Sequence, residues 1–410
     1  MKYLFPNRVS TQDLSYQQQA KEKHIKQVFD LLRSGRCSSR VELAKKLHLS
    51  SATVSALVDE LIRMELIEEK GLARTSKPGR RSVNLQVKSL GRQIAVFSLT
   101  LRGVRFTLFD LSCNILESFF VRYSPNHNNP EESGDKYASL FESILLRRSR
   151  KYDASKTIVA CICLPGIYVE EENVFSMRAA MNVEISESSM LHLEERLGIP
   201  LFLHNMSMCL AYAEIKHMNP HSNDEGINDL IFINVCDGVS AGIISGGSIF
   251  TGEFNTAGEF GHVSVDLRGH PCSCGNRGCL EQYVNLNAIY KSAVKTCARA
   301  GIESPSSFEE LSEIYLRYPP LVEVIDRTAE RLAFGIYTMM CITGIRRIVV
   351  GGGIESLGEF FLEKLNQYVK ARTLLTQKME MSYPRTGSEG DSLGIAQYFL
   401  DKVYSITSGL

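Results

Sequence analysis

Residues 257–284 read AGEFGHVSVDLRGHPCSCGNRGCLEQYV. This stretch holds three cysteines within eight positions, Cys272, Cys274 and Cys279, whereas the other eight of the chain's 11 cysteines are scattered. Three thiolates and a fourth protein ligand form a tetrahedral zinc site. The gaps Cys-x-Cys and Cys-x4-Cys differ from the usual pairs of two-residue gaps, so spacing alone favours zinc only moderately.

Two features near the cysteines bear on this interpretation. Gly275 and Gly278 would let the backbone fold back around a small ion. His270 and His262 are both close enough in sequence to supply the fourth ligand. Four protein ligands leave no position for water, so such a metal would be structural rather than hydrolytic.

The composition is that of a globular protein of two or three domains, because the 410 residues are 44% hydrophobic and 22% charged. No apolar run reaches the roughly 18 residues of a membrane helix. The first residues, MKYLFPNRVSTQDLSYQQQ, lack the apolar core of a signal peptide. We therefore expect a cytoplasmic protein without membrane contact, in which clustered thiols stay reduced and bind metal.

Charge is distributed unevenly along the chain. Residues 1–90 hold 17 Lys and Arg against 9 Asp and Glu, a net charge of +8. The remainder holds 29 basic and 37 acidic residues, a net charge of −8. A basic N-terminal segment on an acidic body predicts a polyanionic partner at that end.

The apolar pattern of the basic segment predicts three short helices. Their apolar faces are Ile25, Val28, Phe29 and Leu32; Leu43, Ala44 and Leu47; and Val54, Leu57, Val58 and Leu61. Gly35 would end the first helix, and Ser39 would cap the second. The short break HLSS between the second and third helices is typical of a helix-turn-helix.

The third helix begins with four small hydroxyl side chains, Ser50, Ser51, Thr53 and Ser55. Such side chains can enter a major groove and bond phosphates and base edges. One of the two leading serines could instead serve only as the N-cap, which would still leave the other hydroxyls free.

A basic hairpin follows the third helix. Two short strands, 66–69 and 82–87, flank a loop that contains two glycines and a proline. The basic residues expected to contact DNA from this loop are Lys77, Arg80 and Arg81. A cationic tip suits a narrow minor groove, so we predict that residues 17–88 form a winged helix-turn-helix that binds double-stranded DNA.

The rest of the chain contains a repeated order of strands. Strands are expected at 94–101, 105–111 and 114–121, and again about 137 residues downstream at 229–235, 240–246 and 248–253. Helical stretches, 134–149 and 285–299, follow the two copies. The repeat predicts a duplicated, mixed α/β fold with a ligand cleft between two lobes.

The quoted stretch resembles the signature of the ROK family of repressors, open reading frames and kinases. Four further segments occur in the family's order, CLPGIY, LFLHNMSMCLAYAE, GVSAGIISGGSIFTG and RRIVVGGGIES. The resemblance spans about residues 92–405, and a winged helix in front of it resembles the repressor branch. Known members of that branch include repressors of xylose, glucose and N-acetylglucosamine genes.

The resemblance implies an actin-like, sugar-kinase (ribonuclease H-like) body. Its first lobe would span residues 92–204, completed by a C-terminal helix at 391–405. Its second lobe would span residues 205–390 and carry the zinc site. In the family's pattern the histidine of EFGH is the zinc ligand, which selects His262 over His270.

The resemblance also implies a carbohydrate pocket. In ROK proteins the matching glutamates, histidine and asparagine contact the sugar, and a glycine flanks them. The corresponding residues here are Gly166, Asn205, Glu259, His262 and Glu281. A metal that clamps the loop would hold the two carboxylates in place.

The groups that a sugar kinase needs are altered. Family kinases carry Asn-Asp, whose aspartate is the base, where this chain has Asn205-Met206. Their first phosphate turn, Asp-Gly-Gly-Thr, is replaced by residues 98–101, SLTL, and the second turn, 237–242, is changed as well. Gly351–Gly353 remain. We therefore expect no enzyme activity, and a ligand that lacks a polar group opposite Met206.

These observations predict a sugar-responsive transcriptional regulator, a repressor of carbohydrate-metabolism genes. It would bind an inverted-repeat operator as a homodimer or homotetramer, with a sugar or sugar phosphate in the interlobe cleft. One alternative is a ROK sugar kinase with a regulatory head, which the lost groups oppose. Another is a zinc sensor, which the closed ligand set opposes.

Overall fold

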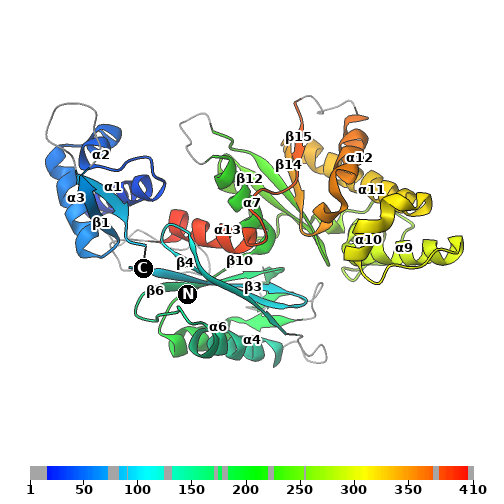
Figure 1. Ribbon diagram of the computed structural model, residues 1–410, viewed down its shortest axis with the longest axis horizontal. Helices are drawn as coiled ribbons and strands as arrows, with labels where there is room; N and C mark the ends of the chain where they lie inside the picture. The colour runs from blue at the N-terminus through cyan, green and yellow to red at the C-terminus, as the bar shows by residue number, and fades with distance from the viewer. Residues whose placement is uncertain are drawn as a thin grey trace.

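The computed structural model describes residues 16–72, 83–89, 91–123, 132–169, 174–177, 183–219, 226–253, 255–372 and 378–404. They form three parts: a small N-terminal head, residues 16–87, and two larger lobes, each built around a five-stranded sheet (Figure 1). None of the described helices combines the length and apolar character needed to cross a membrane.

The head contains the three predicted helices and a two-stranded sheet. Its elements are α1 (Tyr16–Arg33), α2 (Arg40–Leu47), α3 (Ser51–Arg63), β1 (Ile67–Leu72) and β2 (Val83–Val87). Ser39 and Ser50 are the N-caps of α2 and α3 and accept hydrogen bonds from the backbone N–H groups of Glu42 and Thr53. The hairpin loop with Lys77, Arg80 and Arg81 lies outside the described residues.

The two lobes contain sheets with the same strand order. Lobe 1 has the order β5-β4-β3-β6-β10, and lobe 2 has β13-β12-β11-β14-β15. The lobe 1 strands are β3 (Gln93–Thr100), β4 (Gly103–Asp110), β5 (Ile115–Arg122), β6 (Thr157–Leu164) and β10 (Leu201–Asn205). The lobe 2 strands are β11 (Leu230–Val235), β12 (Val239–Ser245), β13 (Ser248–Ile249), β14 (Arg347–Gly351) and β15 (Glu380–Ser382).

In both sheets the first three strands pair antiparallel, and the last two join in parallel. The predicted duplication is therefore confirmed by topology. The third strand of the second copy is much shorter than the predicted 248–253, because β13 ends at Ile249.

Helices cover the sheets. In lobe 1 they are α4 (Glu132–Ser143) with the π-turn η3 (Ile144–Arg148), α6 (Glu187–Leu197), and α13 (Gly390–Tyr398) with η7 (Phe399–Val403). Lobe 1 also has a small sheet of β7 (Ile167–Val169), β8 (Val174–Ser176) and β9 (Glu184–Ser186). In lobe 2 they are α8 (Glu281–Val284), α9 (Leu286–Ala300), α10 (Phe308–Ile314), α11 (Pro319–Thr343) and α12 (Gly358–Lys370), with the 3-10 turns η4 (Phe260–His262), η5 (Tyr315–Arg317) and η6 (Ile354–Leu357).

One further helix, α7 (Met206–Met218), connects the lobes. It follows β10 of lobe 1, packs against β11 and β12 of lobe 2, and lies beside α13. Figure 1 shows α13 in red between the blue head and the green α7. The head and lobe 1 share one apolar cluster, in which Ile25 and Leu85 of the head belong with Phe399 and Tyr404.

Candidate functional site

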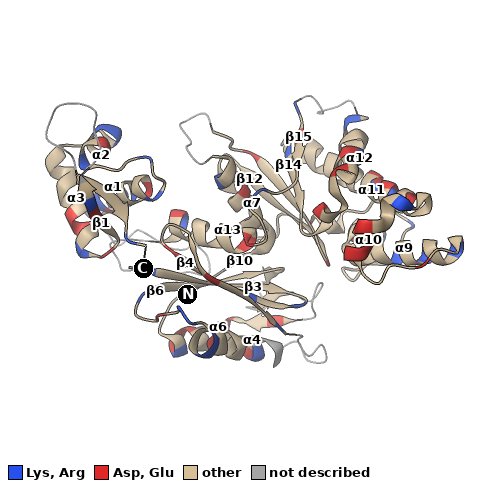
Figure 2. Ribbon diagram, viewed as in Figure 1, with Lys and Arg blue, Asp and Glu red and all other residues tan. Residues whose placement is uncertain are grey.

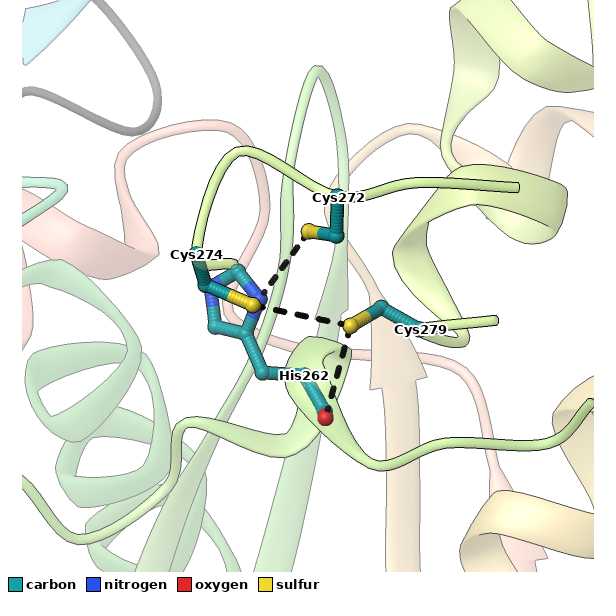
Figure 3. Close-up of side chains that lie close together, drawn as sticks. All are labelled: His262, Cys272, Cys274 and Cys279. Carbon is teal, nitrogen blue, oxygen red and sulfur yellow. Dashed lines mark hydrogen bonds between the residues drawn. The ribbon is translucent and has the colours of Figure 1, made fainter. Parts of the chain in front are cut away.

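The three cysteines of the quoted stretch lie together with His262. One ligand atom from each of the four residues lies within 4.8 Å of all the others. Figure 3 shows the side chains facing one another, with 3.6 Å between the Sγ atoms of Cys274 and Cys279 and 3.6 Å from Cys272 Sγ to His262 Nδ1. A Zn–S bond of about 2.3 Å gives a tetrahedral edge of about 3.8 Å, so the spacing fits zinc.

Two glycines allow the chain to form this cluster. Gly278 has φ +66°, and a Cβ there would lie 1.7 Å from the carbonyl oxygen of Asp266. Gly258 has φ +97°, and a Cβ there would lie 1.9 Å from the carbonyl oxygen of Ala241. The backbone segments that carry the ligands therefore approach each other, and β12, more closely than any side chain would allow.

The thiol pKa values shift in opposite directions within the cluster. Burial opposes the thiolate form of Cys272, but hydrogen bonds from Cys274, Cys279 and His262 together outweigh it and lower the Cys272 pKa to about 7. Burial and the neighbouring thiols raise the pKa of Cys279 to about 12. Three adjacent thiolates repel one another, and a bound cation would stabilise them. The three cysteines and His262 therefore fit zinc both in chemistry and in geometry.

A second layer of contacts connects the cluster to carboxylates. Glu259 Oε2 lies 3.7 Å from His262 Nε2, while the Nδ1 atom of the same ring faces Cys272. Gln282 Nε2 lies 3.5 Å from Cys272 Sγ. A histidine held between a cluster and a carboxylate has a fixed ring orientation, so the cluster also fixes Glu259.

Glu259 and Glu281 lie near each other. Burial, opposed by His262 and reinforced by the Glu281 carboxylate, raises the pKa of Glu259 above its ordinary value. Glu281 Oε2 accepts a hydrogen bond from the backbone N–H of Val239 at 3.2 Å, at the turn between β11 and β12. The carboxylates of Glu259 and Glu281 could both accept hydrogen bonds from a sugar hydroxyl. The cysteine loop holds the first, and the turn between β11 and β12 holds the second.

Asn205 and Gly166 form a second group, contributed by lobe 1. The Asn205 side-chain amide donates to the carbonyl oxygen of Gly166 at 2.9 Å and caps α7 by accepting from the N–H groups of Ser207 and Met208. A hydrogen bond connects this lobe 1 group to the glutamates of lobe 2. Ser207 Oγ, beside Asn205, lies 2.6 Å from the hydroxyl of Ser240, the residue after Val239.

Comparison with known proteins identifies the chain's family. The ROK family profile matches residues 104–399, which is most of the chain. The chain belongs to the ROK family. A winged helix-turn-helix DNA-binding profile matches residues 24–68, which lie in the head.

The chain is similar in sequence to repressors of the ROK family and in fold to a ROK regulator and ROK kinases. It is 29% identical over 364 residues to the xylose repressor of Caldicellulosiruptor bescii, covering 84% of this chain and 87% of that protein. A ROK transcriptional regulator described as a homologue of the Escherichia coli MLC protein has a TM-score of 0.75 at 22% identity, with 94% and 98% coverage. A ROK glucokinase from Streptomyces griseus, in complex with glucose and AMPPNP, has a TM-score of 0.60 at 21% identity, with 74% and 98% coverage.

The positions at which we predicted a departure from the family kinases have defined surroundings. Met206 is only 9% exposed and belongs to the apolar cluster that contains Cys163 and Cys209. Ser98 is buried, and its hydroxyl lies 2.9 Å from that of Ser392 on α13. At the remaining glycine turn, the carboxylate of Glu355 accepts from the backbone N–H of Gly353 at 2.7 Å.

In the head, the first turn of α3 faces solvent. Ser50, Ser51 and Thr53 are exposed and Ser55 is half-buried. The hydroxyls of Ser50 and Thr53 lie 2.8 Å apart, so these two side chains are hydrogen-bonded to each other. Figure 2 shows basic residues on the neighbouring α2, whose last turn carries Lys45 and Lys46.

Sequence reasoning missed several polar residues of the site. Ser207, Ser240 and Gln282 contact the predicted residues, and although each lies in a segment that resembles the family, none was singled out as a site residue. The only sequence signal for Gln282 is its position directly after Glu281 and three residues after Cys279. The two serines meet through the packing of α7 on β12, which local sequence does not reveal.

Proposed function

We propose that this protein is a sugar-responsive DNA-binding repressor of carbohydrate-metabolism genes. The observation that carries the proposal is the combination of a winged-helix head, whose third helix presents exposed hydroxyls, with a body of the sugar-kinase type. The protein would act in the cytoplasm, where its operator lies. The test is to select operators from random-sequence DNA with the full-length protein and to measure their release by sugars.

The effector would lie between the lobes. Gly166 and Asn205 come from lobe 1, whereas Glu259, His262 and Glu281 come from lobe 2, so a ligand that contacts both groups favours one closure angle. D-xylose is the first candidate, because the Caldicellulosiruptor bescii relative is named a xylose repressor. Calorimetry with xylose, glucose, N-acetylglucosamine and their phosphates distinguishes sugar from sugar phosphate.

We assign a structural role to the metal, with His262, Cys272, Cys274 and Cys279 holding Zn²⁺. When bound, the ion supplies a fixed centre for the loop and does not need to take part in any reaction. The four residues form the only cluster of this kind among the described residues. Their task is to orient Glu259 through His262 and Glu281 through the neighbouring Cys279.

Sugar phosphorylation is not expected. The Met206 thioether, packed in an apolar cluster, cannot accept a hydroxyl proton, and Ser98 occupies the first phosphate turn. The Glu355 carboxylate already binds the N–H of Gly353, so an anionic phosphate would be repelled there. A coupled assay for ADP release with each hexose and pentose should give no signal above the protein-free rate.

We propose that the protein binds an inverted-repeat operator as a homodimer or homotetramer. A two-fold axis would place two copies of α3 about one DNA turn, or a multiple, apart. Selected operators should therefore contain two half-sites in inverted orientation. Recovery of single, unpaired half-sites would contradict the dimer.

The wing provides a prediction on phosphate contacts. Arg80→Ala combined with Arg81→Ala should weaken operator binding and reduce the slope of log K against log salt by roughly 1 to 2, because two phosphate contacts are lost. Arg147→Ala with Arg148→Ala, an exposed pair on η3 of lobe 1, removes the same charge as a control. Equal salt slopes for both variants in gel-shift titrations would refute the wing assignment.

A further inference from the structure

The head is attached to the body by a buried ion pair. Arg33, the last residue of α1, donates to the carboxylate of Asp401 in η7, and both side chains are only 11% exposed. Nearby, Lys26 Nζ donates to the carbonyl oxygen of Tyr404 at 3.0 Å. Arg33 also lies 3.7 Å from Asp30 of its own helix, and its bond to Asp401 is the ion pair that joins α1 to the body.

The same carboxylate is also held from the other side. Tyr212 and Lys216, one turn apart on α7, both donate to Asp401 Oδ2 at 2.8 Å. Burial would raise the pKa of Asp401, but Arg33 and Lys216 outweigh it and hold that pKa below its ordinary value. Asp401 is therefore ionised at neutral pH and shared between the head and α7.

The other end of α7 lies at the candidate sugar site. Asn205 caps the helix and bonds Gly166, and Ser207 bonds Ser240 of lobe 2. From the first turn to Lys216 the helix rises about 15 Å. One rigid element thus spans the distance from the sugar site to the carboxylate that anchors the head, and Figure 1 shows it beside α13 at the centre of the molecule.

We propose that Asp401 positions the DNA-binding head on the body, and that α7 makes this position depend on the sugar site through Tyr212 and Lys216. The proposal rests on the DNA-binding function proposed above. A ligand that changes the angle between the lobes would act on α7 from both sides, because α7 packs on β11 and β12 of lobe 2 and along α13 of lobe 1. The donors on Asp401 then move, and the head with them.

The test cuts the α7 contact while leaving the ion pair of the head. The variant is Tyr212→Phe with Lys216→Met. Lobe 2 offers a matched control, because Tyr368 and Lys364 of α12, also one turn apart, contact Asp326 of α11. The control is Tyr368→Phe with Lys364→Met. Hydrogen exchange of the full-length, zinc-loaded proteins is measured with and without an operator selected from random-sequence DNA.

Allosteric coupling is reciprocal, so operator binding should slow exchange in the first turns of α7 by about fivefold or more in the wild type. The α12 control protein should show the same slowing of exchange in α7 as the wild type. The α7 variant should bind the operator within about threefold of the wild type yet lose this response, since coupling and affinity are separate terms. An unchanged response in the α7 variant, or no response in the wild type, overturns the proposal.

A second arm needs neither operator nor sugar. Arg33→Met should speed exchange by about fivefold or more in residues 399–404 and in the last turn of α7, while α12 stays unchanged. Acceleration confined to α1 would mean that the ion pair has only a local structural role and would overturn the proposal. If no operator can be selected, the DNA-binding function is contradicted, and this arm still decides whether Asp401 links α1 to α7.

Discussion

Zinc content should fall from about one ion per chain to about one tenth of that in the Cys279→Ser protein, because the hydroxyl is a poor ligand and only three donors remain. Structural zinc contributes several kcal/mol to folding, so the thermal midpoint should drop by about 10 °C or more. Elemental analysis and scanning calorimetry of the purified protein measure the two quantities.

Cys297 provides the matched control for this variant. It is fully buried in α9, as Cys279 is in its loop, but it lies outside the four-residue cluster. Cys297→Ser should keep its zinc and lose only the stability that a buried hydroxyl costs. Equal zinc content in the two variants, or a wild-type protein without zinc, would contradict the metal assignment.

Sugar affinity should fall by about tenfold to a hundredfold in the Glu281→Gln protein, because a hydrogen bond to a charged acceptor is replaced by one to a neutral amide. The glutamine oxygen can still accept from the N–H of Val239, so the turn between β11 and β12 should remain intact. Operator affinity without sugar should stay unchanged. Titration calorimetry with D-xylose and a gel-shift assay measure the two affinities.

Glu253→Gln serves as the comparison, because Glu253 is an exposed glutamate in the connection between β13 and η4, whereas Glu281 begins α8. It should bind sugar as the wild type does. A Glu281→Gln protein that binds sugar normally would remove Glu281 from the pocket. If no sugar in the panel binds the zinc-loaded wild type, the sugar-sensor proposal itself is contradicted.

Periodic features of the chain were predictable from sequence. The predicted apolar helix faces, which include Val28 and Leu57, are buried in the head, and the repeated strands form two sheets with the same strand order. Such elements are predictable because a helix or strand that is buried on one face needs apolar residues at a regular spacing in the sequence. The cysteine cluster was also recognisable, since its ligands lie close together in sequence. The long helix α11, which has many buried residues, was not predicted.

Contacts between distant segments were not predictable. The bond from Glu281 to Val239 spans 42 residues and that from Ser207 to Ser240 spans 33, and neither leaves a local pattern. Met206 was expected to select a ligand that lacks a polar group there, and this stays a prediction. The structure places the Met206 side chain in one apolar cluster with Cys163 and Cys209.

The attachment of the head also has a consequence for synthesis. Arg33 and Asp401 are 368 residues apart in the chain. At about 5 to 20 residues per second, a ribosome needs about 20 to 70 s to translate that distance. During this time the N-terminal head has already emerged, while its docking partner does not yet exist. Each nascent molecule therefore carries a head without its ion pair to the body, and this pair forms only when the last helix of the body has been made.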